Sequence, residues 1–226
     1  MNFDNRVLWI VDVGGFDFWV TETHVNTWII MAFLIVCALF LRRALNNFSQ
    51  VPEARSKQNA IEAVIETFDN FVKNTMGPEN RAYGNWFFGV FIFILASNLS
   101  GLVNLRPPTA DPTTTLALSI VSFMIIQLSG AIRNTRGYIK SYLEPWPIFL
   151  PMNIIGEASV AVSLGIRLFG NILAGLIVMG LIYYFLPWFL TAGLPAVFHA
   201  YFDLFAGVMQ AFIFTVLSMA FIKNKL

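Results

Sequence analysis

Charge is scarce in this sequence. Asp, Glu, Lys and Arg together make up 12% of the 226 residues, about half of the ~25% typical of soluble globular domains. Hydrophobic residues make up 57%, and the mean hydropathy is +0.68. This composition predicts a membrane protein. The net charge of +1 gives no basis for a nucleic-acid partner, because such binding requires a clustered basic surface.

Cysteine is almost absent too. Cys37 is the single cysteine, which excludes an internal disulfide and a cysteine-based zinc site, and we expect it to pack as a small buried hydrophobic residue. No basic leading region precedes the first apolar segment, so a signal peptide is not predicted. Residues 1–24 contain Trp9 and Trp19. We expect them to form an outside segment at the membrane interface, where tryptophan is favoured.

The motifs of nucleotide binding and hydrolysis are missing as well. There is no GxxxxGK(S/T) or GxGxxG loop, no HExxH zinc motif and no GxSxG nucleophile motif. We therefore expect a chain that is not an enzyme by itself and that has neither a cofactor nor a metal site.

The sequence is instead rich in long apolar segments. They cover approximately residues 25–41, 86–103, 113–132, 152–186 and 196–222. Each is long enough to cross the bilayer as a helix. A proline-rich turn joins the second segment to the third, so that 86–132 forms a hairpin. We predict a single all-α, multi-pass membrane domain over residues 1–226.

Residues 53–76 have a different pattern. Apolar side chains recur there every three or four residues, and charged side chains fill the other face. The two sets are Ile61, Val64, Ile65, Phe68, Val72 and Met76, and Glu62, Glu66, Asp69 and Lys73. This pattern is typical of an amphipathic helix that lies on the membrane surface or packs against a partner. Gly77 and Pro78 are expected to end it.

The basic residues predict the orientation. Eleven of the fourteen Lys and Arg residues follow the first, third and fifth apolar segments, whereas Arg6 and Arg106 lie on the opposite side and Arg167 lies within a segment. By the positive-inside rule, the N-terminus is outside, and the C-terminus and helix 53–76 are cytoplasmic.

The last two segments exceed the length that a span needs. Residues 152–186 would form a helix of about 52 Å, whereas the hydrocarbon core is ~30 Å thick. A straight helix of that length must lean beyond the usual ~0–40°. We therefore predict two long helices in 152–222 that are strongly tilted, with a break in the helix as the alternative.

Arg167 is the most informative side chain, because a guanidinium keeps its charge in a protein. At least fifteen largely apolar residues flank it on each side, so it cannot easily reach an interface. Charges at such positions usually face a bundle interior or an aqueous cavity and mark an ion path. Ser163 and Asn171 share its helical face. Glu157 lies about 15 Å nearer the cytoplasmic end, where it is either solvated or lines a water path.

The fifth segment carries polar groups near one helical face, namely His199, Asp203 and Gln210. Asp203 is its only acid. A carboxyl that titrates inside the membrane is what a proton relay needs, and a neutral buried carboxyl is the alternative. His199 is nearer the outside and is expected to be a polar residue of the interfacial belt. Asp111, in the outside turn, is expected to cap a helix.

Two runs resemble signatures of subunit a of F-type ATP synthases. The first extends from Ser163 through Arg167 to Asn171 and is followed by Ala174 and Gly175; the second extends from Gln210 to Phe214. Further matches are Pro52, Gln58, Asn59, Glu62, Asn98, Leu99, Thr109, Ala110 and Asp111. The resemblance covers nearly the whole chain, in order and at matching spacing.

The resemblance implies a non-catalytic stator subunit in a bacterial inner membrane. It implies two half-channels against a rotating c-ring, with Arg167 between them, that couple proton or sodium flow to ATP synthesis. The implied ion path comprises Asn171, Asp203, Gln210, Glu157, His199, Asp111 and Ser163. The implied partners are the c-ring, subunit b of the peripheral stalk, other ATP synthase subunits and the lipid bilayer. The alternative is a self-contained secondary ion transporter or channel, although the sequence shows no inverted repeat.

The chain departs from the resembled family at three positions. Many relatives have an acid directly after the Ala-Gly pair, where this chain has Leu176, and some have His at the position of Asp203. We expect that the titratable group of the inlet has moved from the fourth segment to the fifth. Relatives also often have Lys-Pro at the position of Val160 and Ala161, which leaves no role for a lysine there.

Overall fold

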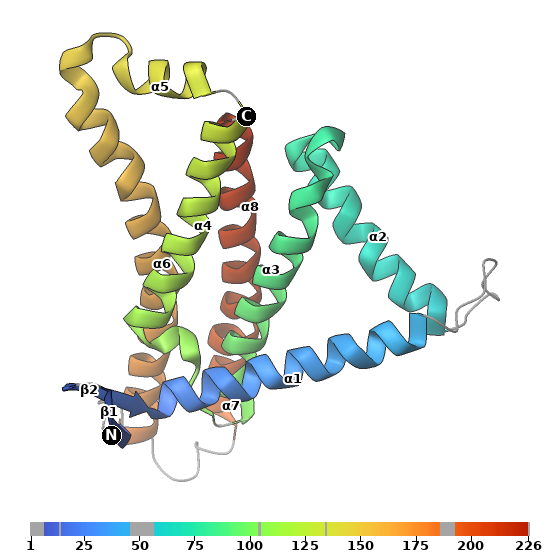
Figure 1. The fold of residues 1–226 in the computed structure, drawn as a ribbon. Coiled ribbons are helices and arrows are strands. Elements are labelled where there is room, and N and C mark those ends of the chain that lie inside the picture. Colours follow the sequence, from blue (N-terminus) through green and yellow to red (C-terminus); the bar gives the residue numbers. More distant parts are fainter. Residues whose placement is uncertain are drawn as a thin grey trace.

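A computed structural model describes residues 7–13, 15–45, 57–103, 105–133, 135–185 and 193–225. Helices dominate the fold (Figure 1), so the predicted all-α class is confirmed. Five helical stretches are long and apolar enough to cross a membrane, as predicted. They cover Glu22–Arg43, Pro78–Val103, Pro112–Arg133, Pro147–Phe185 and Pro195–Lys225.

The N-terminal segment contains a β-hairpin that the all-α prediction did not include. Strand β1 (Val7–Val13) pairs antiparallel with β2 (Phe16–Thr21). Gly15 adopts a φ of +91° in the turn, a conformation open to glycine. Alternating aromatic and acidic residues give the period of two that is typical of strands. Trp9 and Trp19 are both exposed.

Helix α1 (Glu22–Leu45) follows the hairpin directly and has an exposed apolar surface along most of its length. Cys37 on this helix is half-buried rather than buried. In Figure 1, α1 crosses the other long helices steeply instead of running beside them.

Helix α2 (Lys57–Met76) occupies most of the range expected for the amphipathic helix, and residues 53–56 lie outside the described residues. Gly77, with a φ of +92°, and the following Pro78 end it. On its polar face, Asp69 pairs with Lys73 at 2.7 Å and with Arg81 at 2.9 Å. The hydrogen bond from Lys73, reinforced by Arg81, lowers the pKa of Asp69 below its ordinary value.

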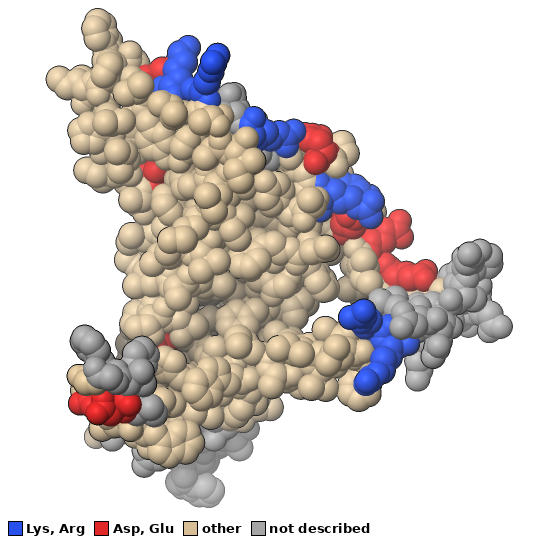
Figure 2. All heavy atoms as spheres, viewed as in Figure 1, with Lys and Arg blue, Asp and Glu red and all other residues tan. Residues whose placement is uncertain are grey.

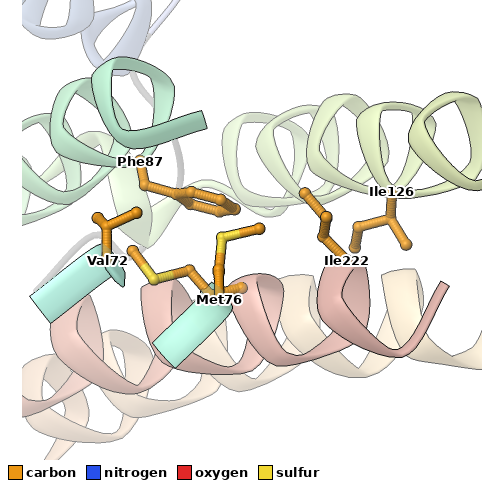
Figure 3. Close-up of a cluster of buried hydrophobic side chains, with 6 residues drawn as sticks. Val72, Met76, Phe87, Ile126 and Ile222 are labelled. Carbon is orange, nitrogen blue, oxygen red and sulfur yellow. The ribbon is translucent and has the colours of Figure 1, made fainter. Parts of the chain in front are cut away.

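The buried residues of α2 anchor it to the membrane helices. Val72 and Met76 pack against Phe87, Ile126 and Ile222 (Figure 3). These partners belong to three helices, α3 (Gly84–Leu99), α4 (Pro112–Arg133) and α8 (Gly207–Lys225). The amphipathic helix is thus fixed at one end by apolar contacts.

The expected hairpin is formed by α3 and α4, and α8 lies between its two legs because it contacts both. Two short 3₁₀ segments, η2 (Ser100–Val103) and η3 (Pro108–Ala110), make up the described turn. Helix α4 packs in turn along α6 (Leu150–Phe185). A second apolar cluster joins α3, α6 and α8, and its buried members are Val90, Ile94, Leu164, Leu168, Ala211 and Phe214.

The two long apolar segments differ in continuity. Helix α6 has 36 residues without a break, so it would measure about 54 Å. The last segment comprises α7 (Leu194–His199), a π-helical stretch η5 (Ala200–Ala206) and α8.

Short elements connect the long helices. Between α4 and α6, the chain forms α5 (Thr135–Leu143) and the 3₁₀ segment η4 (Pro147–Phe149). The 3₁₀ segment η1 (Pro78–Tyr83) joins α2 to α3.

Candidate functional site

Arg167 lies on the exposed face of α6, in the middle of this long apolar helix. Within the described part of the chain, no carboxylate pairs with its guanidinium and no group accepts a hydrogen bond from it. One turn away on either side, the exposed neighbours of Arg167 are the uncharged polar residues Ser163 and Asn171. The larger apolar residues exposed on α6 are Ile155, Val162, Ile166, Ile177 and Leu181. The structure therefore presents a single unpaired cation on a largely apolar face.

A hollow of about 320 Å³ lies beside Arg167. Helix α6 lines it with glycine, serine and apolar residues, and α8 completes the wall. The lining residues other than Arg167 are Gly156, Ser159, Val160, Ser163, Leu164, Leu217 and Phe221. Ser163 thus shares both the hollow and the helical face of Arg167, as the spacing predicted.

Asn171 and Gln210 connect the two long segments. Asn171 Nδ2 donates a hydrogen bond to Gln210 Oε1 over 2.6 Å, from α6 to α8. Gln210 is only 2% exposed, so its amide is fixed between the helices while Asn171 remains at the surface. The structure therefore brings together one predicted site residue from each signature run.

Asp203 lies within η5 and takes part in a chain of three polar groups. Its Oδ2 is 2.5 Å from His199 Nδ1, and His199 Nε2 is 3.1 Å from the Tyr183 hydroxyl on α6. His199 is therefore a partner of Asp203 rather than an isolated belt residue. Tyr183 was not among the predicted site residues, because its pairing depends on how α6 and α7 face each other, which sequence spacing does not specify.

The π-helical stretch sets the direction of these groups. One turn of π-helix contains more residues than an α-turn, so it changes the angle between side chains that precede and follow it. His199 and Asp203 consequently point towards Tyr183, whereas Gln210, seven residues after Asp203, points to Asn171. The predicted common face of the last segment is thus divided into two polar groups.

Asn98 fastens this region to α3. Its Nδ2 donates to the Gly207 carbonyl over 2.9 Å, and its Oδ1 accepts from Thr109 Oγ1 over 2.8 Å. A side chain on Gly207 would come within 3.0 Å of Asn98 Cβ, so the close approach needs glycine. These contacts give structural roles to Asn98 and Thr109, which the sequence singled out.

Asp111 caps α4, as expected for this turn. Its Oδ1 accepts a hydrogen bond from the Thr113 backbone N–H over 2.9 Å, and its Oδ2 accepts one from Thr23 Oγ1 over 2.9 Å. The carboxylate therefore ties the start of α4 to the start of α1. These contacts link Asp111 to the helix ends rather than to Asp203.

Glu157 is neither fully solvated nor alone. Lys225 Nζ on α8 lies 2.7 Å from its Oε1, and Gln127 Nε2 on α4 donates to its Oε2 over 3.2 Å. Sequence reasoning missed both partners. Gln127 could have been suspected only because it is an isolated glutamine inside the third apolar segment. Across the described residues, no three His, Cys, Asp or Glu side chains gather as metal ligands.

Similarity to known proteins extends over most of the chain. The sequence pattern of the family described as ATP synthase A chain matches residues 25–223. A sodium ion specific ATP synthase subunit a from Propionigenium modestum is 33% identical over 94% of this chain and 76% of its own length. Subunit a from Moorella thermoacetica is 34% identical over 90% of this chain and 89% of its own length.

A third relative, an ATP synthase subunit a from Acaryochloris marina, is 34% identical over 91% of this chain and 85% of its own length. The family match and these relatives each cover most of the sequence, and the family match includes Arg167 and the last apolar segment. The chain therefore belongs to the ATP synthase A chain family, the ion-translocating stator subunits of the F-type ATP synthase membrane sector.

Proposed function

We propose that this chain forms two ion half-channels against a rotating ring of c subunits, with Arg167 between them, and couples proton or sodium flow to ATP synthesis. The observation that carries the proposal is the exposed Arg167 side chain, which has no partner within the described residues. An arginine at the centre of a bilayer costs at least ~2.5–3.5 kcal/mol. A carboxylate on each ring subunit would supply the missing opposite charge.

A fixed guanidinium at this position has two effects on an ion that rides on a ring carboxylate. It favours the ionised carboxylate, so the ion leaves before the carboxylate reaches Arg167. It also repels cations that would pass directly from one half-channel to the other. One charge that crosses the full field gains only ~2.3 kcal/mol per 100 mV. ATP synthesis therefore needs several ions, and a direct leak would waste the gradient.

The polar groups on α6 and in the last apolar segment suggest the two paths. For the inlet we propose Asp203 and His199, which exchange protons with the outside, followed by Asn171 and Gln210 near the ring. For the outlet we propose the hollow beside Arg167, which includes Ser163 and leads towards Glu157. Asp111 would support the inlet only through its contacts with the helix ends.

The distribution of charge supports the proposed orientation in a bacterial inner membrane. Figure 2 shows Lys and Arg side chains over α5, the turn between α2 and α3, and the C-terminal end of α1. Acidic side chains lie by the β-hairpin and also along α2, beside the basic ones. We assign the basic side to the cytoplasm and the hairpin to the outside. Because α1 crosses the other long helices steeply (Figure 1), an upright α1 requires α6 and α8 to lie obliquely.

The same arrangement suggests where partners bind. The exposed apolar face of α6 around Arg167 is the proposed surface for the c-ring. The exposed apolar surface of α1 remains for lipid and for the membrane segment of subunit b. The other ATP synthase subunits would contact the cytoplasmic side.

Substitution Arg167→Ala in the assembled complex tests the proposal. We expect ATP hydrolysis to persist and ATP-driven ion pumping by membrane vesicles to be abolished, because nothing then separates the half-channels. Ile166→Ala is a matched control on the same exposed face; because it trims one apolar contact but leaves the charge of Arg167, it should keep coupled pumping. Tightly coupled pumping by Arg167→Ala would refute the proposed function.

A further inference from the structure

Lys225, in the last turn of α8, is enclosed on several sides. Its Nζ lies 2.7 Å from Glu157 Oε1, and 5.0 and 5.5 Å from the ring centres of Tyr142 and Tyr138 on α5. Only 15% of its side chain is exposed. Two aromatic rings and a carboxylate around an ammonium form a cage of the kind that binds cations.

The cage is held by a second layer of contacts. Gln127 Nε2 donates to Glu157 Oε2, and Gln127 Oε1 accepts from the Tyr138 and Tyr142 hydroxyls over 2.8 and 3.1 Å. At Gly130 on α4, a Cβ atom would lie 3.1 Å from both Lys225 Cβ and Tyr138 Cδ2. The cluster thus draws on α4, α5, α6 and α8.

The caged pair is close in sequence to two residues that line the hollow beside Arg167. Gly156, which lines the hollow, directly precedes Glu157, and Phe221 lines it one helical turn before Lys225. Among the described residues, the charged or titratable groups in contact with this cluster are Glu157, Lys225, Tyr138 and Tyr142. If the proposed outlet continues from the hollow towards Glu157, a departing ion would pass a carboxylate whose charge is already balanced.

We propose that Lys225 is a positioning residue for ion release, because its caged ammonium holds Glu157 in place and neutralises it at the outlet. The inference rests on the proposed function. It states how Lys225 balances the charge of Glu157 at the proposed outlet. An unpaired carboxylate there would retain a departing cation, and an unpaired ammonium would repel it. The pair does neither.

The test compares Lys225→Met, Glu157→Gln and the double variant in the assembled complex, reconstituted in liposomes. We expect each single variant to slow ATP synthesis driven by an imposed ion gradient by roughly tenfold, the size typical of losing a supporting partner beside a site. The double variant should recover to within about twofold of the parent, because neither charge is then unpaired. Lys225→Arg should also recover most of the rate, and Lys223→Met is the matched control, since Lys223 is exposed two residues earlier.

Unchanged synthesis in Lys225→Met, or a double variant as slow as the single variants, would overturn the inference. Acylation of lysines in the parent complex tests it even if a variant fails to assemble. Lys225 should react at least about tenfold more slowly than Lys223, and equal rates would contradict the cage. The Arg167→Ala variant, measured in parallel, separates the two proposals. If Arg167→Ala retains coupled pumping, the half-channel proposal is refuted, whatever the result for the Lys225 variants.

Discussion

Asp203 has the contacts that a proton-transfer group needs, because one carboxylate oxygen meets the His199 imidazole and that ring meets the Tyr183 hydroxyl. A proton can pass along such a chain by small shifts between neighbouring atoms. This chain of polar groups joins η5, which contains Asp203, to the C-terminal end of α6, which contains Tyr183, through His199 at the end of α7. In the proposed orientation, these three side chains are the candidates for proton entry from the outside.

Asp203→Asn removes the titrating carboxyl and keeps the shape of the side chain. We expect proton uptake from the outside to fall by roughly 100-fold, within the range of a positioned proton-transfer group, while the complex still assembles. Fluorescence quenching in proteoliposomes of the assembled complex, recorded at several outside pH values, measures this uptake. Asp203→Glu is the control that restores a carboxyl. If Asp203→Asn took up protons at the rate of the parent and with the same pH dependence, Asp203 would not be part of the inlet.

Individual site residues could be recognised from the sequence when their chemistry conflicts with an apolar environment. Arg167 and Asp203 stand out for that reason, although the face that Asp203 was expected to share with Gln210 is divided in the structure. Tyr183 and Lys225 could not be recognised, because a tyrosine near an interface and a lysine after an apolar segment are ordinary there. Their partners are set by the packing of separate helices, which the spacing along one helix does not contain.

The contact between α4 and α6 depends on small residues at the crossing. A Cβ atom at Gly165 would lie 2.7 Å from Ser119 Oγ and 2.9 Å from Leu116 Cδ2. Small residues let helix backbones approach closely in membranes, where packing provides much of the association energy. The position of Arg167, two residues later, is thus fixed by this close approach.

Gly165→Ala is expected to destabilise this packing by about 1–3 kcal/mol, as for other overpacked contacts. Gly170→Ala is the matched control on the same helix, since nothing lies within 4 Å of its added Cβ. It should instead leave stability unchanged or raise it by up to about 1 kcal/mol, because alanine favours helix. Thermal release of the chain from the purified complex measures both. Equal melting temperatures for the two variants would contradict the role of Gly165.

Helices could be predicted from the sequence wherever the length of an apolar segment was enough to indicate a membrane span. The five spans and the amphipathic α2 were predicted from hydropathy and periodicity. The hairpin of β1 and β2 was missed, although residues 7–21 alternate and contain a glycine pair. The π-helical stretch could not be predicted, because its local sequence is as apolar as that of its neighbours and its extra residue is accommodated by packing.

The basic and acidic sides of the molecule give the orientation a direct test. The parent has one cysteine, so a Cys37→Ser background permits single-site labelling. We expect Asp12→Cys to react with a membrane-impermeant maleimide added to intact cells, and Lys223→Cys to react only in inverted vesicles. Both parent residues are exposed. Labelling from the opposite sides would reverse the assigned orientation.

The exposed face of α6 has a mechanical consequence. Apolar contact is not directional, so two such surfaces can slide past each other with little change in free energy. Arg167 adds one strong attraction to a surface that is otherwise uncharged and largely apolar. A rotor moving along it would meet little friction between carboxylates and would pause once for each carboxylate. The angular step of the motor would then equal the spacing of those groups on the ring.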